Sequence, residues 1–411
     1  VRAIASGAIT DGEPVIVNSA GTVSGVTDAT AQTLGSEVVF ESAASKYTAT
    51  VFDSNSNRIV VAYQDEGNSN YGTAIVGTVS GTGISFGTPV VFESANPTSY
   101  IRATFDSNSN KVVIAYTDGG NSYYGTAIVG TVDSSDNSIS FGSATVIESG
   151  YLLQFGIAFD SSNNKVVIAY THQPSSETGK AIVGTVSGTS ISFGTAVTFD
   201  SNANNSSNSV GFDSSNNKVV VSYRDWGNSQ YGTAKVGTVS GTDISFGSAV
   251  VFNSGDTQWM STAFDSSNNK IVIAYQDDGA SAHGYAIVGT VSGTGISFGT
   301  EVEFINENMA RTTIAFDSNV NKVVIGFLDT SDSNKGKLVV GTVSGTGISY
   351  GSLVVFNAGN GTTWLSSAFD SSNNKVVISY KDGGNSGHGT SINFANAAPT
   401  TLTSENFIGF A

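Results

Sequence analysis

The sequence FDSSNNKIVIAYQDDG at residues 264–279 recurs with few changes as FDSNSNKVVIAYTDGG at 105–120 and FDSSNNKVVISYKDGG at 369–384. Seven such segments begin with a Phe-Asp pair, whose Phe residues are Phe52, Phe105, Phe159, Phe212, Phe264, Phe316 and Phe369. Successive Phe residues are 52 to 54 positions apart. This interval is too long for a two-helix repeat and lies close to the roughly 40 to 50 residues of a four-stranded propeller blade.

Each repeat contains four segments that read as β-strands. NKVVIAY at 110–116 is continuously apolar between two polar, turn-forming stretches, which is typical of a strand buried on both faces. GTAIVGTV at 72–79 and ISFGTPVVFES at 84–94 are two further strands, and SGTG at 80–83 predicts a hairpin between them. YIRATF at 100–105 is the fourth. We therefore expect four antiparallel strands in each repeat.

The repeats predict an all-β protein, a seven-bladed β-propeller of four-stranded antiparallel blades at residues 34–396. Sheets that are apolar on both faces must be covered by one another, and radial stacking achieves this. GSEVVFES at 35–42 reads as an outer strand without the other three, whereas GTSINFAN at 389–396 ends a repeat that lacks its outer strand. We therefore expect the N-terminal strand to complete the C-terminal blade and close the ring without a free edge.

The two ends of the chain fall outside the repeats. Residues 1–33 predict a small β appendage, with turn signals at Asp11-Gly12 and Ala20-Gly21, and residues 397–411 predict a strand or tail beside it. Because the first residue is Val1, we expect the chain to derive from a longer precursor.

The composition excludes several classes of function. The chain has 33 acidic and 17 basic residues, and its formal charge of −16 opposes binding to nucleic acid or to an anionic membrane surface. It has no cysteine, which excludes disulfides, thiolate metal sites and a cysteine nucleophile. No apolar run approaches the roughly 20 residues of a membrane-spanning helix. We expect no nucleic-acid or membrane partner.

Two polar phrases recur in the repeats, and the first suggests cation binding at first sight. FDSSNNK offers one carboxylate per repeat, far below the six to eight oxygen ligands of Ca²⁺, whereas Asp and Asn are typical turn residues. The phrase DxGxSxxG occurs at 65–72, 118–125, 225–232, 277–284 and 382–389. It is similar to the Asp-box turn of sialidase-like propellers, although it lies between the second and third strands and lacks the final Trp. We predict that both phrases form turns and that the chain holds no metal and no cofactor.

Flat rings recur at two positions of the repeat. The position five residues before each Phe, called here the ring position, holds Tyr47, Tyr100, Gln154, Ser207, Trp259, Arg311 and Trp364. The position before the last Gly of DxGxSxxG holds Tyr71, Tyr124, Tyr231, His283 and His388. Because both loops emerge on the same face of a propeller, these rings could stack on sugars and bond their hydroxyl groups. The alternative is that they cover the top of the central channel or pack over adjacent turns.

Catalysis requires an acid, base or nucleophile that departs from the repeat. Two of the three histidines, His283 and His388, occupy a repeated position, and no triad, HExxH motif or phosphate loop is present. Sialidase-like chemistry needs converging arginines, yet Arg102, Arg224 and Arg311 lie at different offsets in their repeats. The sequence therefore predicts a protein that is not an enzyme.

The repeats are rich in Ser, Asn, Gly and Thr, and SGAITDGEPVIVNSAGTVSG (6–25) and LTSENFIGFA (402–411) flank them. In these features the chain resembles virion-associated β-propeller repeat proteins of marine tailed bacteriophages. The resemblance implies a structural protein at the virion surface, of the tail fibre or receptor-binding type, that attaches to host glycan and contacts other virion proteins through its terminal appendage. A purely structural decoration or linker protein of the virion, or a bacterial surface adhesin, would share these features.

Overall fold

A computed structural model of the chain describes residues 14–17, 22–25, 32–94, 97–173, 177–201, 206–396 and 407–410. The chain divides into two compact parts, one of residues 34–394 and one of residues 1–33 with 395–411. Across the described ranges, none of the helices has the length and apolar character needed to cross a membrane.

The terminal part contains a small antiparallel sheet. Strands β1 (Pro14–Val17), β2 (Val23–Gly25) and β35 (Phe407–Phe410) pair in the order β2-β1-β35. The chain's first and last strands therefore belong to one sheet. The turns expected at Asp11-Gly12 and Ala20-Gly21 lie outside the described residues.

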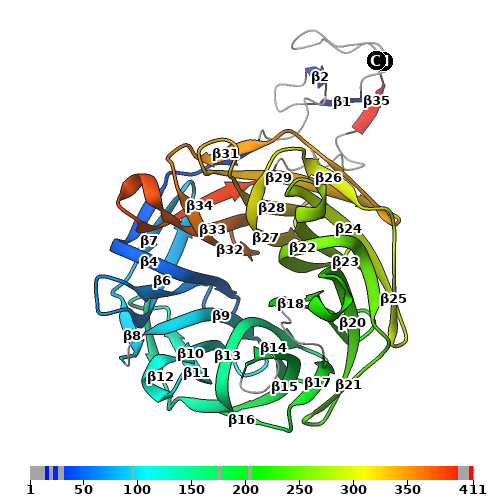
Figure 1. Ribbon diagram of the computed structural model, residues 1–411. Helices are drawn as coiled ribbons and strands as arrows, with labels where there is room; N and C mark the ends of the chain where they lie inside the picture. Colours follow the sequence, from blue (N-terminus) through cyan, green and yellow to red (C-terminus); the bar gives the residue numbers. More distant parts are fainter. Residues whose placement is uncertain are drawn as a thin grey trace. The chain divides into compact units, whose positions relative to one another are not determined.

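Each repeat of the larger part begins with three long antiparallel strands, most of which are labelled in Figure 1. The first strands are β4 (Val38–Asp53), β9 (Thr98–Asp106), β13 (Thr145–Asp160), β18 (Ser206–Asp213), β22 (Val250–Asp265), β27 (Met309–Asp317) and β32 (Thr362–Asp370). The second strands are β5 (Arg58–Asp65), β10 (Lys111–Asp118), β14 (Lys165–His172), β19 (Lys218–Asp225), β23 (Lys270–Asp277), β28 (Lys322–Asp329) and β33 (Lys375–Asp382). The third strands are β6 (Tyr71–Ser80), β11 (Tyr124–Asp133), β15 (Thr178–Ser187), β20 (Tyr231–Ser240), β24 (His283–Ser292), β29 (Lys335–Ser344) and β34 (His388–Ala395).

The fourth, outer strand differs from its prediction because it is broken in two. In the first repeat, β7 (Gly83–Phe86) pairs with one end of β6 and β8 (Val90–Glu93) with the other. The same arrangement uses β12 (Ser138–Phe141), β16 (Ser190–Phe193), β17 (Val197–Asp200), β21 (Asp243–Phe246), β25 (Gly295–Phe298), β26 (Val302–Ile305), β30 (Gly347–Tyr350) and β31 (Val354–Asn357). Four short 3₁₀ turns follow second strands, at Gly119–Asn121, Trp226–Asn228, Asp278–Ala280 and Gly383–Asn385.

The repeats are not separate sheets, which corrects the expectation of seven independent blades. Strands β4, β13 and β22 are each 16 residues long. Each is the outer strand of one repeat at its start and the first strand of the next repeat at its end. The larger part therefore has four continuous sheets, three of nine strands and one of five. Within these sheets every Phe-Asp repeat keeps its own ladder of first, second and third strands.

The hydrophobic core lies between successive repeats. Val60 and Ala62 of the first repeat, for example, pack in one buried cluster with Val112 and Ile114 of the second. Similar clusters join the other neighbouring repeats. Figure 1 shows the consequence, with the first strands facing the centre and the short outer strands at the periphery. Because the second strands are covered on both faces, their continuous apolar runs are buried, as expected.

The first and last repeats pair with each other as predicted. Residues 38–44 of β4 lie antiparallel to residues 388–391 of β34. Phe40, on the same stretch, is buried in a cluster that also contains Val377 of the last repeat. The Tyr380 hydroxyl donates to the Glu37 carboxylate at 2.9 Å. The N-terminal strand therefore supplies the outer strand that the C-terminal repeat lacks.

The repeated aspartates form turns, as expected. Asp370 is 1% exposed, and its Oδ1 accepts backbone N–H bonds from Ser372 at 2.9 Å and Asn373 at 3.1 Å. Asp65 of the second phrase likewise accepts from the backbone of Gly67 and Asn68. Among the described residues, no group of three or more His, Asp or Glu side chains is placed to hold a metal ion.

Candidate functional site

The ring positions share an unusual backbone. Each first strand has a register shift against the second strand at this point, which is the mark of a β-bulge. Six ring residues have left-handed backbone angles, namely Tyr47 (φ 53°), Tyr100 (52°), Gln154 (52°), Trp259 (50°), Arg311 (54°) and Trp364 (54°). This conformation costs an L-residue about 1–2 kcal/mol and is rare for bulky side chains. The same strained conformation therefore recurs at one position of six repeats.

Replacing Gln154 tests whether the backbone at the ring position is strained. Glycine adopts φ 52° without a Cβ penalty but loses more conformational entropy on folding. We therefore expect the free energy of unfolding of Gln154→Gly to lie within about 1 kcal/mol of that of the unsubstituted chain. Gln154→Val adds a β-branched side chain, and we expect it to be about 1–2 kcal/mol less stable. Urea unfolding measures both. A glycine variant less stable than the valine variant would show that side-chain packing, and not backbone strain, governs this position.

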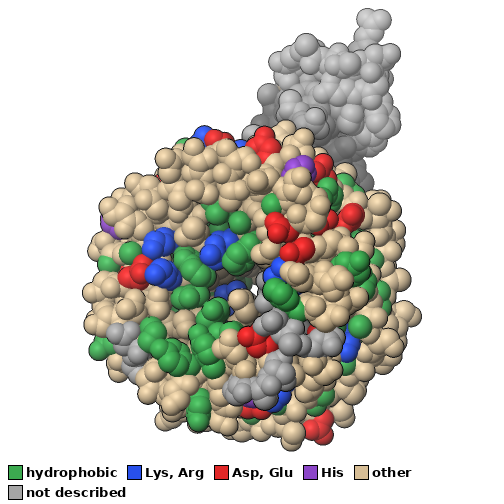
Figure 2. All heavy atoms as spheres, in the orientation of Figure 1, with side chains coloured by type: hydrophobic (Ala, Val, Ile, Leu, Met, Phe, Trp, Pro, Cys, Tyr) green, Lys and Arg blue, Asp and Glu red, His purple; other side chains and the backbone are tan. Residues whose placement is uncertain are grey.

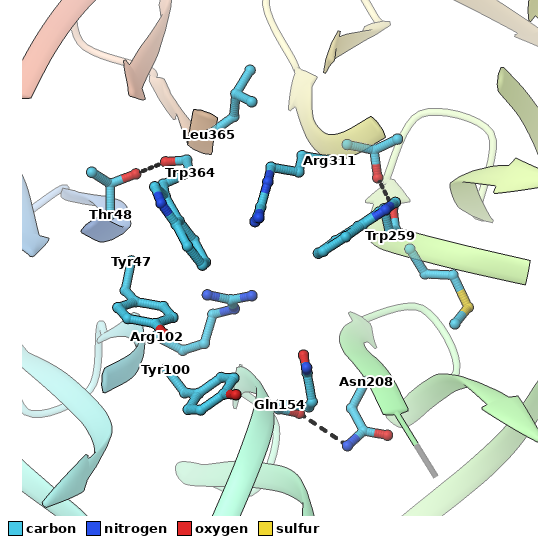
Figure 3. Close-up of a pocket in the computed structure, with 12 residues that line it drawn as sticks. Tyr47, Thr48, Tyr100, Arg102, Gln154, Asn208, Trp259, Arg311, Trp364 and Leu365 are labelled. Carbon is cyan, nitrogen blue, oxygen red and sulfur yellow. Dashed lines mark hydrogen bonds between the residues drawn. The ribbon is translucent and has the colours of Figure 1, made fainter. Parts of the chain in front are cut away.

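The bulges bring the ring residues of neighbouring repeats into contact around the axis. The ring centroids of Tyr100 and Tyr47 are 5.2 Å apart, and those of Tyr47 and Trp364 are 4.2 Å apart. The Arg311 guanidinium carbon lies 4.0 Å from the Trp364 ring centroid and 4.4 Å from that of Trp259. Figure 3 shows Arg311 between the two indoles, with the tyrosines continuing the row. Such cation–π contacts are worth about 0.5–2 kcal/mol each.

These side chains surround a pocket of about 220 Å³. Its lining consists of Tyr47, Thr48, Tyr100, Arg102, Gln154, Asn208, Trp259, Met260, Arg311, Thr312, Trp364 and Leu365. We call it the axial pocket. Figure 2 shows hydrophobic and basic side chains gathered around the hollow at the centre of this face. The four aromatic ring residues are half-buried, so part of each ring faces the pocket.

Hydrogen bonds between repeats hold three ring residues in place. The Thr48 hydroxyl donates to the backbone carbonyl of Trp364, and the Thr312 hydroxyl donates to that of Trp259. The Asn208 side-chain amide donates to the carbonyl of Gln154 at 2.9 Å. Each donor follows the ring position of its own repeat and reaches the preceding repeat. The bulges are therefore fixed before any ligand arrives, which lowers the entropy cost of binding.

Two arginines give the pocket a positive charge. Arg102 is exposed to the pocket and also lines a second cavity of about 200 Å³ that shares six of the same residues. Burial within the surrounding channel, with a smaller contribution from Arg311, lowers the pKa of Arg102 to about 10. Burial also lowers the pKa of Arg311. Burial raises the pKa of Tyr47 and Tyr100, so both phenols are neutral at pH 7 while Arg102 stays cationic.

The second set of predicted rings lies elsewhere. Tyr71, Tyr124, Tyr231, His283 and His388 begin the third strands and pair with the last residues of the second strands. All five are half-buried, and none lines the axial pocket. His283 is engaged by Glu303, whose carboxylate lies 2.7 Å from Nδ1. Their predicted role in ligand binding therefore remains a prediction, without support from the pocket.

The expectation that arginines do not converge is wrong for Arg102 and Arg311, which line the same pocket. Different offsets do not prevent this, because residues from all seven repeats line the axial pocket. Arg224 does stay apart, paired with Asp256 at 2.7 Å. A sequence signal for Arg102 exists: two residues after the ring position the other repeats have only small residues, namely Ala49, Gly156, Ser209, Ser261, Thr313 and Ser366.

The strand ladders and the buried interfaces between repeats define the fold as a β-propeller. No family model and no curated protein sequence matches the chain. Solved structures do match. A mutant of the NanB sialidase from Streptococcus pneumoniae aligns at a TM-score of 0.50 and 10% identity, over 88% of this chain and 70% of that one. A triple mutant of AofleA from Arthrobotrys oligospora aligns at a TM-score of 0.50 and 10% identity, over 82% and 93%. At this identity the similarity establishes the fold alone.

Proposed function

We propose that this chain is a non-enzymatic, seven-bladed propeller that recognises cell-surface glycan in the axial pocket. The observation that carries the proposal is the row of bulky ring residues on left-handed bulges. A protein that needed these residues only to close the central channel could use Gly or Asn at these positions without strain. Exposed aromatic faces at a concave polar site are suited to the apolar faces and hydroxyl groups of a sugar.

Several features support seven blades in a closed ring. Seven Phe-Asp repeats each have a three-stranded ladder, and successive repeats share a buried core. The pairing of β4 with β34 joins the first repeat to the last. On this proposal, the four continuous sheets are seven blades, some of which are linked by uninterrupted strands.

The lining of the pocket supports binding without catalysis. Its twelve residues include no Asp, Glu, His or Lys, so it offers no side chain with the usual pKa of a general acid or base at pH 7. The tyrosines have raised pKa values through burial, which makes them weaker acids. An arginine-and-aromatic pocket is instead typical of recognition.

The setting that we propose is the surface of a phage virion, as a tail fibre or receptor-binding component. The support is the resemblance of the repeats and the terminal segments to virion-associated propellers. The terminal part of the chain would then contact other virion proteins. The rival function is structural decoration of the virion without recognition of a host, for which the axial rings would serve only to close the channel.

Two tryptophan substitutions test glycan recognition. We expect Trp259→Ala and Trp364→Ala each to weaken binding to a glycan array or to host cells by at least about 10-fold, since each removes a pocket wall. Both rings are half-buried, so the free energy of unfolding should fall by about 1–2 kcal/mol, less than the roughly 3–5 kcal/mol of a fully buried Trp.

The third tryptophan is the matched control for this test. Trp226 is 40% exposed, lies in a 3₁₀ turn and has its own cation–π contact with Arg224, but it does not line the pocket. Trp226→Ala should leave glycan binding unchanged. If the two pocket variants lose stability but keep full binding, the structural decoration role becomes the better account.

A further inference from the structure

The axial pocket contains two guanidinium groups and no carboxylate among its lining residues. Arg311 is stacked between two indoles, and among the described residues the Arg102 guanidinium donates to the backbone carbonyl of Ile101 alone, at 2.9 Å. Within the described ranges, no ion pair joins either arginine to an Asp or Glu. This is unusual in a chain with 33 acidic residues.

The positive charge of the axial pocket has no carboxylate counterion among the lining residues. The two arginines are close enough for the charge of Arg311 to lower the pKa of Arg102. Both are partly desolvated by the channel around them. An anion placed between the two guanidinium groups would attract both of them and offset their mutual repulsion. It would also accept charge-assisted hydrogen bonds, which are about twice as strong as neutral ones. The pocket is therefore built for a ligand that carries a negative charge.

A neighbouring groove extends the site. It has a volume of about 400 Å³ and is more open than the axial pocket, and Tyr47 and Tyr100 form walls of both. Tyr123 and Tyr151 line its far side, with ring centroids 5.1 Å apart. The exposed fractions of these two rings are 42% and 36%, so their faces are accessible. Aromatic surface thus continues from the axis outward.

We propose that the axial pocket binds one negatively charged sugar residue and that the groove binds the sugars attached to it. The ligand is then an acidic oligosaccharide, whose carboxylate or sulfate group lies against Arg102 and Arg311. At about 220 Å³ the axial pocket is below the roughly 300–1,000 Å³ of sites for drug-sized ligands, which fits one sugar residue and excludes a chain. The inference rests on the proposed function and specifies its ligand class.

The test uses the full chain and a panel of defined oligosaccharides, in which uronic-acid, nonulosonic-acid and sulfated members stand beside neutral ones of the same length. We expect the chain to bind acidic members and to lose affinity at least about 10-fold when the carboxyl group is reduced to an alcohol. A preference for carboxylated or for sulfated members identifies which anion the arginines hold.

Variants locate the charge and the groove. Arg102→Gln should weaken binding of the acidic ligand at least about 10-fold. Arg102→Lys should weaken it less, because lysine keeps the positive charge but lacks the planar guanidinium that can donate two parallel hydrogen bonds. Lys111→Gln removes the same charge in the same repeat outside both cavities and should have no effect. Tyr123→Ala should weaken binding of a tetrasaccharide about 3- to 10-fold but leave binding of the acidic monosaccharide unchanged.

The outcomes separate this inference from the function on which it rests. Binding to neutral members alone, or acidic binding that Arg102→Gln leaves intact in a folded variant, overturns the acidic ligand but retains glycan recognition. The absence of binding to every member of the panel overturns both.

Discussion

Deletion of residues 1–42 is expected to abolish formation of the monomeric propeller and to produce aggregates. The deleted stretch carries most of the outer strand of the last repeat, and its residues 38–41 pair with residues 389–391 of β34. It also carries Phe40, whose ring centroid lies 5.1 Å from that of Tyr63 in the buried cluster between the last and first repeats. Without it, β34 presents unpaired backbone groups and an apolar face, which is a template for association with other chains.

Size-exclusion chromatography and thermal unfolding measure this effect. The matched control removes residues 1–32 and 397–411 together, which takes away the terminal sheet but keeps β3 (Thr33–Leu34) and β4. We expect the control to remain monomeric with an almost unchanged melting temperature. A monomeric, fully stable chain without residues 1–42 would show that the pairing of β4 with β34 does not hold the larger part together.

Gly142→Ala is expected to lower the free energy of unfolding by about 2–3 kcal/mol, a large effect for one methyl group. Gly142 follows β12, and a Cβ there would overlap the backbone carbonyl oxygen of Thr189 in the hairpin of the next repeat. Backbone cannot move aside as a flexible side chain can. The same approach occurs between Gly87 and Asn137 and between Gly194 and Thr242.

The chain contains its own control for this substitution. Gly351 holds the corresponding position in the sixth repeat, yet among the described atoms only the Val340 carbonyl oxygen comes within 4 Å of an added Cβ, at 3.9 Å. Gly351→Ala should change stability by less than about 0.5 kcal/mol. Equal losses in the two variants, measured by urea unfolding, would indicate that the intrinsic properties of glycine and not the approach of the next repeat determine the cost.

The strand order and the closing pair were predictable because they follow from local patterns. Apolar runs between turn residues determine strands such as β10, and the unmatched strand at 35–42 had one place to pair. The break in the outer strand was not predictable from the same patterns. ISFGTPVVFES reads as one run, but residues 87–89 lie in neither strand, and β7 and β8 pair with opposite ends of β6.

The candidate site was predictable only in part. Tyr47, Tyr100, Trp259 and Trp364 share one offset from the Phe-Asp pair, so a repeat count places them together. Arg102 lies at another offset, and its convergence with Arg311 depends on the radius of the channel. Tyr123 lies in the turn before β11 and Tyr151 lies within β13, and only the folded chain shows that they line one groove. The left-handed backbone of the ring residues gives no signal in residue type, because Tyr, Trp and Arg are disfavoured there.

The bulge at the ring position makes the side chain there independent of the strand pairing. A bulged residue is left out of the strand ladder, so its side chain can be exchanged without altering the pairing of the first and second strands. The chain already places four residue types there, Tyr, Gln, Trp and Arg, on backbones whose φ angles differ by only a few degrees. On the proposed function, a lineage that follows a changing receptor could therefore exchange its ring residues one repeat at a time, while the propeller that carries them stays the same.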